Sequence, residues 1–307
     1  MDASRSVLGA VTWAAGAADR LRLPLHLVHV LPPAGLGYRR GVPHGRAKAL
    51  LQRATRVATS VAPRVPVTRL TVNARVGSGL ACYSAGARLL VVGSRPGGVP
   101  VARSGGRVLA EVTTLARCPT VVVPVGWAAV RRCKLSTRPV LVGVDGSVAG
   151  ERALAFGAQT ADPLGVSLVP VTAAGLANSS RTIAGGEGQD GLRPGLIARR
   201  LAAYRQHYPS LRIENAVEVG NPATTLLDLG RRAQLIVVGS RGRIGAAGPH
   251  LGPASQTMLR AGWCPVMVIS PRTRYLAEPR PTAPRGVSTR SRTERDSMPV
   301  DAGVPAA

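Results

Sequence analysis

The chain repeats part of its own sequence, and this repeat limits the possible folds more than any other feature does. Short runs in the first half recur in the same order in the second half, at offsets of 141 or 146 residues. The matching pairs are Leu27–Val30 with Leu168–Val171, Leu89–Arg95 with Leu235–Arg241, and Cys118–Val123 with Cys264–Ile269. Three matches in one order indicate two copies of a single domain.

The repeat also sets the domain boundaries. We assign residues 1–126 to the first copy and residues 139–271 to the second, with a linker over residues 127–138. Residues 272–307 are rich in Pro, Arg and Ser and have little apolar periodicity, which predicts a disordered tail. Hydrophobic residues make up 45% of the chain, so there is enough apolar material for two cores.

The second copy has the pattern of strands that alternate with helices. Short apolar runs separate segments of helical pattern, and Gly and Pro residues stand at the transitions. The expected strands are 139–145, 166–171, 213–219, 235–238 and 265–269, and the expected helices are 150–160, 193–208, 222–232 and 252–261. This alternation predicts an α/β fold with a doubly wound, parallel, five-stranded sheet. Ligands of such sheets bind outside the carboxyl ends of the strands, where the strand order switches.

The first copy lacks its beginning. Asp2 precedes Trp13 by eleven residues, as Asp145 precedes Phe156, so the two aspartates align. The apolar strand that leads to Asp145 in the second copy has no counterpart before Asp2. Two explanations stay open at this point: the true start lies upstream, or the first copy is a four-stranded sheet with an exposed edge.

A glycine-rich loop follows the fourth predicted strand of the second copy. Gly239 and Gly242 are separated by two residues, and nine more residues precede Gly252 at the start of a predicted helix. Glycine lets the backbone turn tightly and bring N–H groups close to an anion, and a helix N-terminus favours phosphate. The loop is therefore a candidate phosphate site, and a plain strand-to-helix connection is the alternative.

This glycine spacing resembles the nucleotide loop of the universal stress protein family. The segments Val142–Ser147, Val237–Gly242 and Cys264–Val266 resemble the first strand and turn, the fourth strand and the fifth strand of that family. The likeness covers nearly all of residues 1–271 as two tandem copies. It implies an adenine-nucleotide alpha-hydrolase-like fold for each copy, with the first copy lacking its first strand.

The resemblance also implies a set of nucleotide contacts in the second copy. Asp145 is implied to face the adenosine end of a bound ATP, and backbone groups of Val171 are implied to meet the adenine. The glycines Gly239, Gly242 and Gly252 are implied to wrap the ribose and phosphates, with Ala254 and Ser255 at the helix start and Arg241 completing the cofactor-binding set.

Both copies depart from the family pattern. Pro253 stands where the family has Ser or Thr, so an N–H and a hydroxyl are lost together as phosphate donors. At roughly 1 kcal/mol each, these losses weaken phosphate binding about tenfold or more, and Ser255 would compensate in part. In the first copy, Pro96 replaces the second glycine and Arg107 replaces the Ser or Thr after Gly106. We expect the first copy to pack and dimerise rather than bind a nucleotide.

The sequence shows no catalytic or metal site. His29 aligns with Pro170 in a predicted strand, which favours a structural role, and neither Ser94 nor Ser240 lies in a nucleophile elbow. The four cysteines have no CxxC spacing, and no second carboxylate accompanies Asp145. We expect no protein-bound metal, no disulfide framework and no enzyme, because the slow ATP hydrolysis of some family members has no identifiable catalytic base here.

The net charge of +25 is unevenly divided. Residues 1–134 hold 20 basic and 3 acidic residues, whereas residues 135–271 hold 13 and 8. A basic surface attracts polyanions without specificity, but aromatic platforms are scarce and no nucleic-acid-binding motif is present, so we expect no dedicated nucleic-acid partner. The absence of a signal-peptide layout and of an apolar stretch of about 18 residues predicts a cytoplasmic protein with no membrane partner.

The resemblance implies an ATP-binding regulatory or interaction protein of stress adaptation, with the nucleotide held by the second copy. The last strands of the copies, 121–125 and 266–269, are expected to pair across a pseudo-twofold axis or with a second chain. The alternative is a nucleotide-free interaction module whose basic first copy contacts an acidic protein partner or nucleic acid.

Overall fold

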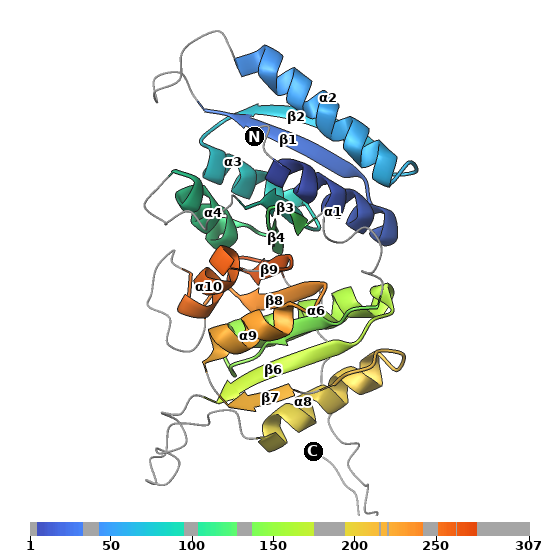
Figure 1. Ribbon diagram of the computed structural model, residues 1–307, viewed down its shortest axis with the longest axis vertical. Coiled ribbons are helices and arrows are strands. Elements are labelled where there is room, and N and C mark those ends of the chain that lie inside the picture. The colour runs from blue at the N-terminus through green and yellow to red at the C-terminus, as the bar shows by residue number, and fades with distance from the viewer. Residues whose placement is uncertain are drawn as a thin grey trace, which may run out of the picture.

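Two α/β halves share one large sheet in the computed structural model (Figure 1). The structure describes residues 5–32, 43–94, 104–127, 137–174, 194–214, 216–219, 221–241, 251–261 and 263–274. Most of the predicted linker and of the predicted tail lies outside these ranges. Figure 1 shows the strands stacked along the long axis of the molecule, with β1, β2 and α2 at one end and β7 and α8 at the other.

The second copy has the predicted alternation of strands and helices. Its elements are β5 (Val140–Gly143), α6 (Val148–Leu164), β6 (Leu168–Ala174), α8 (Pro194–His207), β7 (Ala216–Val219), α9 (Pro222–Gly230), β8 (Leu235–Gly239), α10 (Pro253–Ala261) and β9 (Val266–Ile269). The five strands are parallel, in the order β7-β6-β5-β8-β9. From β5 the chain first adds β6 and β7 on one side and then β8 and β9 on the other side. The strand order therefore switches between β5 and β8, as predicted for a doubly wound sheet.

The first copy repeats these elements without a counterpart of β5 among the described residues. Its elements are α1 (Arg5–Leu21), β1 (Leu25–Leu31), α2 (Pro43–Val61), β2 (Val67–Asn73), α3 (Val76–Tyr83), the short 3₁₀ helix η1 (Ser84–Gly86), β3 (Leu90–Gly93), α4 (Ser104–Leu115) and β4 (Thr120–Val123). Strands β1 and β2 form a separate two-stranded parallel sheet, and β3 and β4 belong to the large sheet.

Of the two explanations for the first copy, the four-stranded sheet is therefore wrong, because its strands belong to two separate sheets. In the second copy, β5 lies between β6 and β8 and pairs with both. The strands β1 and β3 are the counterparts of β6 and β8. Among the described residues no strand lies between them, so they belong to two separate sheets. Strand β3 is only partly buried, whereas Leu235–Val238 of β8 are fully buried.

The last strands of the two copies pair with each other within the chain. Strands β4 and β9 are antiparallel, with Thr120 opposite Val268, Val121 opposite Met267 and Val122 opposite Val266. This pairing joins the copies into a seven-stranded sheet of order β3-β4-β9-β8-β5-β6-β7. Both edges of β4 and of β9 are occupied, so the alternative of pairing these strands with a second chain is excluded in this arrangement.

Helices cover both faces of the large sheet. The core on one face contains buried residues of α6 and α8, with α1 against the same face, and the core on the other face contains residues of α9 and α10. A third core lies between α1, α2 and the β1–β2 pair. In this third region His29 is buried, which lowers its pKa to about 4 and keeps it neutral. This burial agrees with a structural role for His29.

The cysteines that precede the last strands are packing residues in the structure. Cys118 and Cys264 are both buried, at equivalent positions of the two copies. Burial raises the pKa of the Cys118 thiol to about 12, so the reactive thiolate is suppressed. Among the described helices, none is long and apolar enough to cross a membrane.

Candidate functional site

The turn between β5 and α6 fixes the orientation of Asp145. Gly146 has a φ of 77°, a left-handed conformation that suits glycine. Ser147 caps α6 by accepting a 3.0 Å hydrogen bond from the N–H of Gly150. The Oδ1 atom of Asp145 accepts hydrogen bonds from the backbone N–H of Ser147, at 3.0 Å, and from its hydroxyl, at 2.6 Å. The carboxylate is thus held at the carboxyl end of β5.

The first glycine of the loop permits a close approach between β8 and α6. A Cβ atom added to Gly239 would lie 2.6 Å from the Cβ atom of Ala149, in the first turn of α6. No side chain fits there without displacing the helix. Packing alone therefore requires this glycine, and the close contact places the end of β8 beside the turn that carries Asp145.

The two ends of the glycine loop are tied together. The N–H of Gly252 donates a 2.8 Å hydrogen bond to the carbonyl of Ser240, and the N–H of Ser240 donates to the carbonyl of Ile269 at 2.9 Å. Gly242 lies outside the described residues. The N–H of Gly252 is therefore used within the protein, so this group is not a free phosphate donor in the structure.

Helix α10 begins beside the end of β8. Pro253 is its first residue, and Gln256 donates an N–H bond to the carbonyl of Gly252 at 2.9 Å. The hydroxyl of Ser255 is buried and donates a 2.7 Å hydrogen bond to the carbonyl of Gly239. Ser255 therefore does not offer its proton in place of the missing family hydroxyl. The N–H groups of Ala254 and Ser255 belong to the first turn, which leaves such groups outside the helical ladder.

Two polar atoms at the start of the loop are buried without a hydrogen-bond partner in the structure. They are the Oγ atom of Ser240 and the Nε atom of Arg241. A buried polar group with no partner costs about 1–3 kcal/mol, so a hydrogen bond from each of these atoms to a ligand or a water molecule would be stabilising. Arg241 was in the predicted set, whereas Ser240 was not, because sequence reasoning considered it only as a nucleophile.

The adenine side of the predicted site lies on the neighbouring strand. Val171 in β6 is opposite Gly143 in β5, and its carbonyl accepts a 3.0 Å hydrogen bond from the N–H of Val144. Its side chain is buried in the core under α9 and α10. The next residue, Thr172, has a buried Oγ1 atom with no partner, which sequence reasoning did not single out.

The structure thus brings most of the predicted residues to one edge of the sheet. Gly239 ends β8, Asp145 lies two residues after the end of the adjacent strand β5, and a hydrogen bond links Gly239 to Ser255 in α10. In the first copy, the N–H of Ser94 donates to the carbonyl of Val123 at 2.9 Å, as Ser240 does to Ile269. The rest of that loop and Asp2 lie outside the described residues. Within the described part of the chain, no group of three or more His, Cys, Asp or Glu side chains is placed to hold a metal ion.

Known proteins are similar to this chain in sequence and in fold. A model of the universal stress protein family matches residues 1–124 and 136–270. A universal stress protein of Mycolicibacterium smegmatis is 31% identical over 292 residues, which are 89% of this chain and 96% of that protein. Universal stress protein Rv2623 of Mycobacterium tuberculosis is 32% identical over 288 residues, 87% of this chain and 94% of the relative.

A solved structure agrees on the fold. The crystal structure of a universal stress protein from Archaeoglobus fulgidus superposes with a TM-score of 0.57 at 18% identity, and covers 85% of this chain and 93% of its own. The family model matches both copies, and the similarity to the mycobacterial proteins extends through both. The chain therefore belongs to the universal stress protein family, as a member with two tandem domains.

Proposed function

We propose that the second copy binds an adenine nucleotide, ATP, and that the chain acts in stress adaptation as a nucleotide-responsive regulatory or interaction protein rather than as an enzyme. The observation that carries this proposal is the position of Asp145. Its carboxylate is fixed by Ser147 at the carboxyl end of β5, beside the strand switch and the tied glycine loop.

Unused polar groups around this edge support the proposal. Ser240 Oγ and Arg241 Nε have no protein partner, and Arg241 supplies a positive charge at the start of the loop. The first turn of α10 adds backbone N–H groups and the positive end of a helix dipole. These groups suit an anion, and the family membership makes a nucleotide phosphate the expected one.

The same geometry predicts modest affinity. Pro253 has no N–H, the N–H of Gly252 is bonded to Ser240, and the hydroxyl of Ser255 is bonded to Gly239. Each missing donor costs about 1 kcal/mol, and each 1.4 kcal/mol is about tenfold in affinity. ATP is therefore expected to be held by fewer phosphate contacts than the family pattern provides.

The experiment is nucleotide recovery followed by titration. The full chain is purified and denatured, and the supernatant is chromatographed for ATP, while calorimetry measures the affinity for added ATP. Replacement of Gly242 by Leu in the loop should reduce that affinity at least tenfold. The matched control is Pro96→Leu, at the equivalent position of the first copy, which should leave ATP binding unchanged.

A second candidate function rests on the occupied donors just described. If both loops have lost nucleotide binding, the chain is an interaction module, and the basic first copy contacts an acidic partner. The absence of ATP in the denatured supernatant, together with no thermal shift on adding ATP, would favour this second function over the first.

A further inference from the structure

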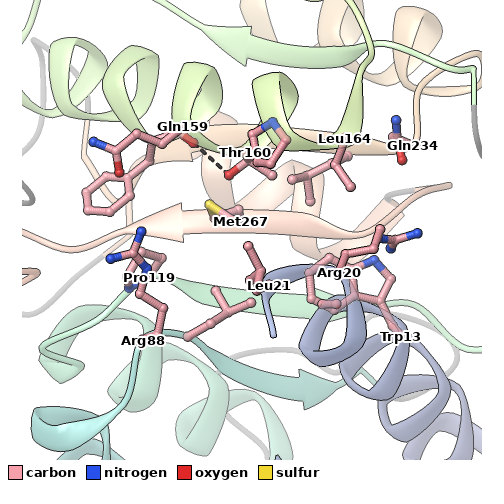
Figure 2. Close-up of a pocket in the computed structure, with 15 residues that line it drawn as sticks. Trp13, Arg20, Leu21, Arg88, Pro119, Gln159, Thr160, Leu164, Gln234 and Met267 are labelled. Carbon is pink, nitrogen blue, oxygen red and sulfur yellow. Dashed lines mark hydrogen bonds between the residues drawn. The ribbon is translucent and has the colours of Figure 1, made fainter. Parts of the chain in front are cut away.

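A cleft lies at the junction of the two copies, on the face of the large sheet that α1 and α6 cover (Figure 2). The cleft is open to solvent on one side. Met267 of β9 lies between the two helices in Figure 2, and Trp13 of α1 and Phe156 of α6 contribute aromatic walls. The cleft therefore lies over the seam where β4 and β9 pair.

The apolar walls of the cleft follow the internal repeat. Equivalent residues of the two copies line it from opposite sides. These pairs are Trp13 with Phe156, Leu21 with Leu164, and Leu89 with Leu235. An apolar surface thus continues across the junction, and a small apolar body placed there would be removed from water on both sides.

The polar residues of the cleft do not follow the repeat. Arg20 and Arg88 come from the first copy, and their equivalents in the second copy are the neutral residues Pro163 and Gln234. No residue that lines the cleft is acidic. Figure 2 shows the two arginine side chains at opposite ends of the cleft, both on the side of the first copy. The cleft is therefore positively charged on one side only.

Two further observations indicate that these polar groups have capacity for a ligand. Arg20 is exposed on one side, and partial burial of its guanidinium lowers its pKa, although the neighbouring Asp19 carboxylate acts in the opposite direction. The Oε1 atom of Gln159, which also lines the cleft, is buried and has no hydrogen-bond partner in the structure. A partly desolvated cation is stabilised by an anion, and the unused acceptor is stabilised by a bound water molecule.

The cleft is separate from the nucleotide position. Gln234 precedes β8 and Leu235 is its first residue, so both lie at the amino end of the strand. By contrast, Gly239 is the last residue of β8, and Asp145 follows the carboxyl end of β5. Arg88 and Leu89 likewise precede β3 in the first copy. The residues of the cleft thus belong to the opposite end of each set of parallel strands, away from the glycine loop.

We propose that this cleft binds a small amphiphile that has an apolar alkyl body and one carboxylate. The body lies over Met267, between Trp13 and Phe156. The carboxylate lies beside Arg20, on the side of the first copy, and Arg88 adds a second positive charge at the opposite end of the cleft. Because each copy supplies one wall, binding favours the paired arrangement of the two copies and couples the ligand to their junction.

Calorimetric titration of the full chain with decanoate and with decanol, each below the concentration at which it aggregates, tests the proposal. Decanoate should bind saturably and at least tenfold more tightly than decanol. In the double variant R20Q/R88Q this preference should disappear, while decanol binding changes less than threefold. The control R53Q/R56Q removes the same charge from exposed positions on α2 and should bind like the original chain.

Two further variants test the walls and the charge separately. Ala17 lines the cleft, and Ala17→Phe should abolish binding of both probes by filling the space. Leu21 is 37% exposed at the rim, so Leu21→Glu should fold normally and weaken decanoate alone. The proposal is overturned if decanoate does not saturate, if R53Q/R56Q lowers its affinity as much as R20Q/R88Q does, or if both Ala17→Phe and Leu21→Glu leave binding unchanged.

Discussion

Val121 of the first copy lies opposite Met267 of the second copy in the antiparallel pair of β4 and β9. Both side chains are buried, Val121 completely and Met267 with 3% of its surface exposed. This single pair of strands joins β3 and β4 of the first copy to the five strands of the second copy in one sheet. The two copies are therefore expected to unfold together in one cooperative transition and not as two independent domains.

The substitution Val121→Asp should break this coupling. A charge would be buried without a partner at the seam, which belongs to the class of changes that cost several kcal/mol. We expect a loss of more than about 3 kcal/mol and a split of the denaturant unfolding curve into two transitions. Val61→Asp is the control, because Val61 is 41% exposed and should change stability by less than about 0.5 kcal/mol. A single transition in Val121→Asp, as steep as in the original chain, would contradict the structural account.

The divided sheet of the first copy predicts a stabilising extension. In the part of the chain that the structure describes, strands β1 and β3 have no central partner like the one that β5 provides in the second copy. A chain in which the sequence of Pro139–Val144 is fused directly before Asp2 should fill this position, because the same segment directly precedes Asp145.

The fused strand should raise the melting temperature by several degrees and slow hydrogen exchange in β3, since burial of an apolar strand and its backbone bonds adds stability. The matched control carries an extension of equal length in which Ser and Asn replace the Val and Leu residues. Equal melting temperatures of the two fusions would show that the position does not accept a strand.

The buried His29 predicts a pH dependence in the first copy. Its pKa is lowered to about 4 in the folded chain, against about 6.5 when exposed in the unfolded chain. Between these two pH values the unfolded state therefore binds more protons than the folded state. The stability that the neutral His29 contributes is complete above pH 6.5 and is lost as the pH falls towards 4. The variant His29→Val should show a smaller fall in melting temperature over this range. An identical fall in both proteins would exclude His29 as the cause.

The proline at the start of α10 predicts a gain of affinity by substitution. Pro253→Ser restores one backbone N–H and one hydroxyl at the position where both are missing. At about 1 kcal/mol each, the two donors should tighten ATP binding about tenfold or more in calorimetry. Pro253→Ala restores the N–H alone and should give a smaller gain. If neither variant tightens binding, the phosphates do not lie at the N-terminus of α10.

The sequence was sufficient to predict the alternating elements of the second copy, because strong apolar runs and Gly or Pro boundaries mark them. Strand β7 is the clearest exception, since the predicted strand over 213–219 is observed only over Ala216–Val219, with an isolated bridge between Leu168 and Ile213. The failure to predict the divided first copy has a different origin. The apolar runs of β1 and β3 are intact, and only the pairing of strands in space shows that they depend on a third strand.

The places of the predicted residues in the fold follow from the sequence, whereas their contacts do not. The sequence placed Gly239 after a strand and Gly252 at the start of a helix, and in the structure Gly239 is the last residue of β8 and Gly252 directly precedes α10. However, Gly239 proved to be required by its contact with Ala149, and the hydroxyl of Ser255 proved to be used by Gly239. Sequence spacing cannot show these uses, because they depend on distances between residues that are far apart in the chain. The unpartnered hydroxyls of Ser240 and Thr172 were missed for the same reason.

The most direct test of the central claim is the amount of ATP that the purified full chain releases and rebinds. The account predicts that denaturation releases ATP, or that calorimetry finds one ATP per chain, and that Gly242→Leu removes this binding while Pro96→Leu keeps it. If no ATP is released, and added ATP gives neither heat nor a thermal shift, the second copy is not a nucleotide site. Loss of binding in Pro96→Leu with full binding in Gly242→Leu would equally contradict the account, since the nucleotide would then lie in the first copy.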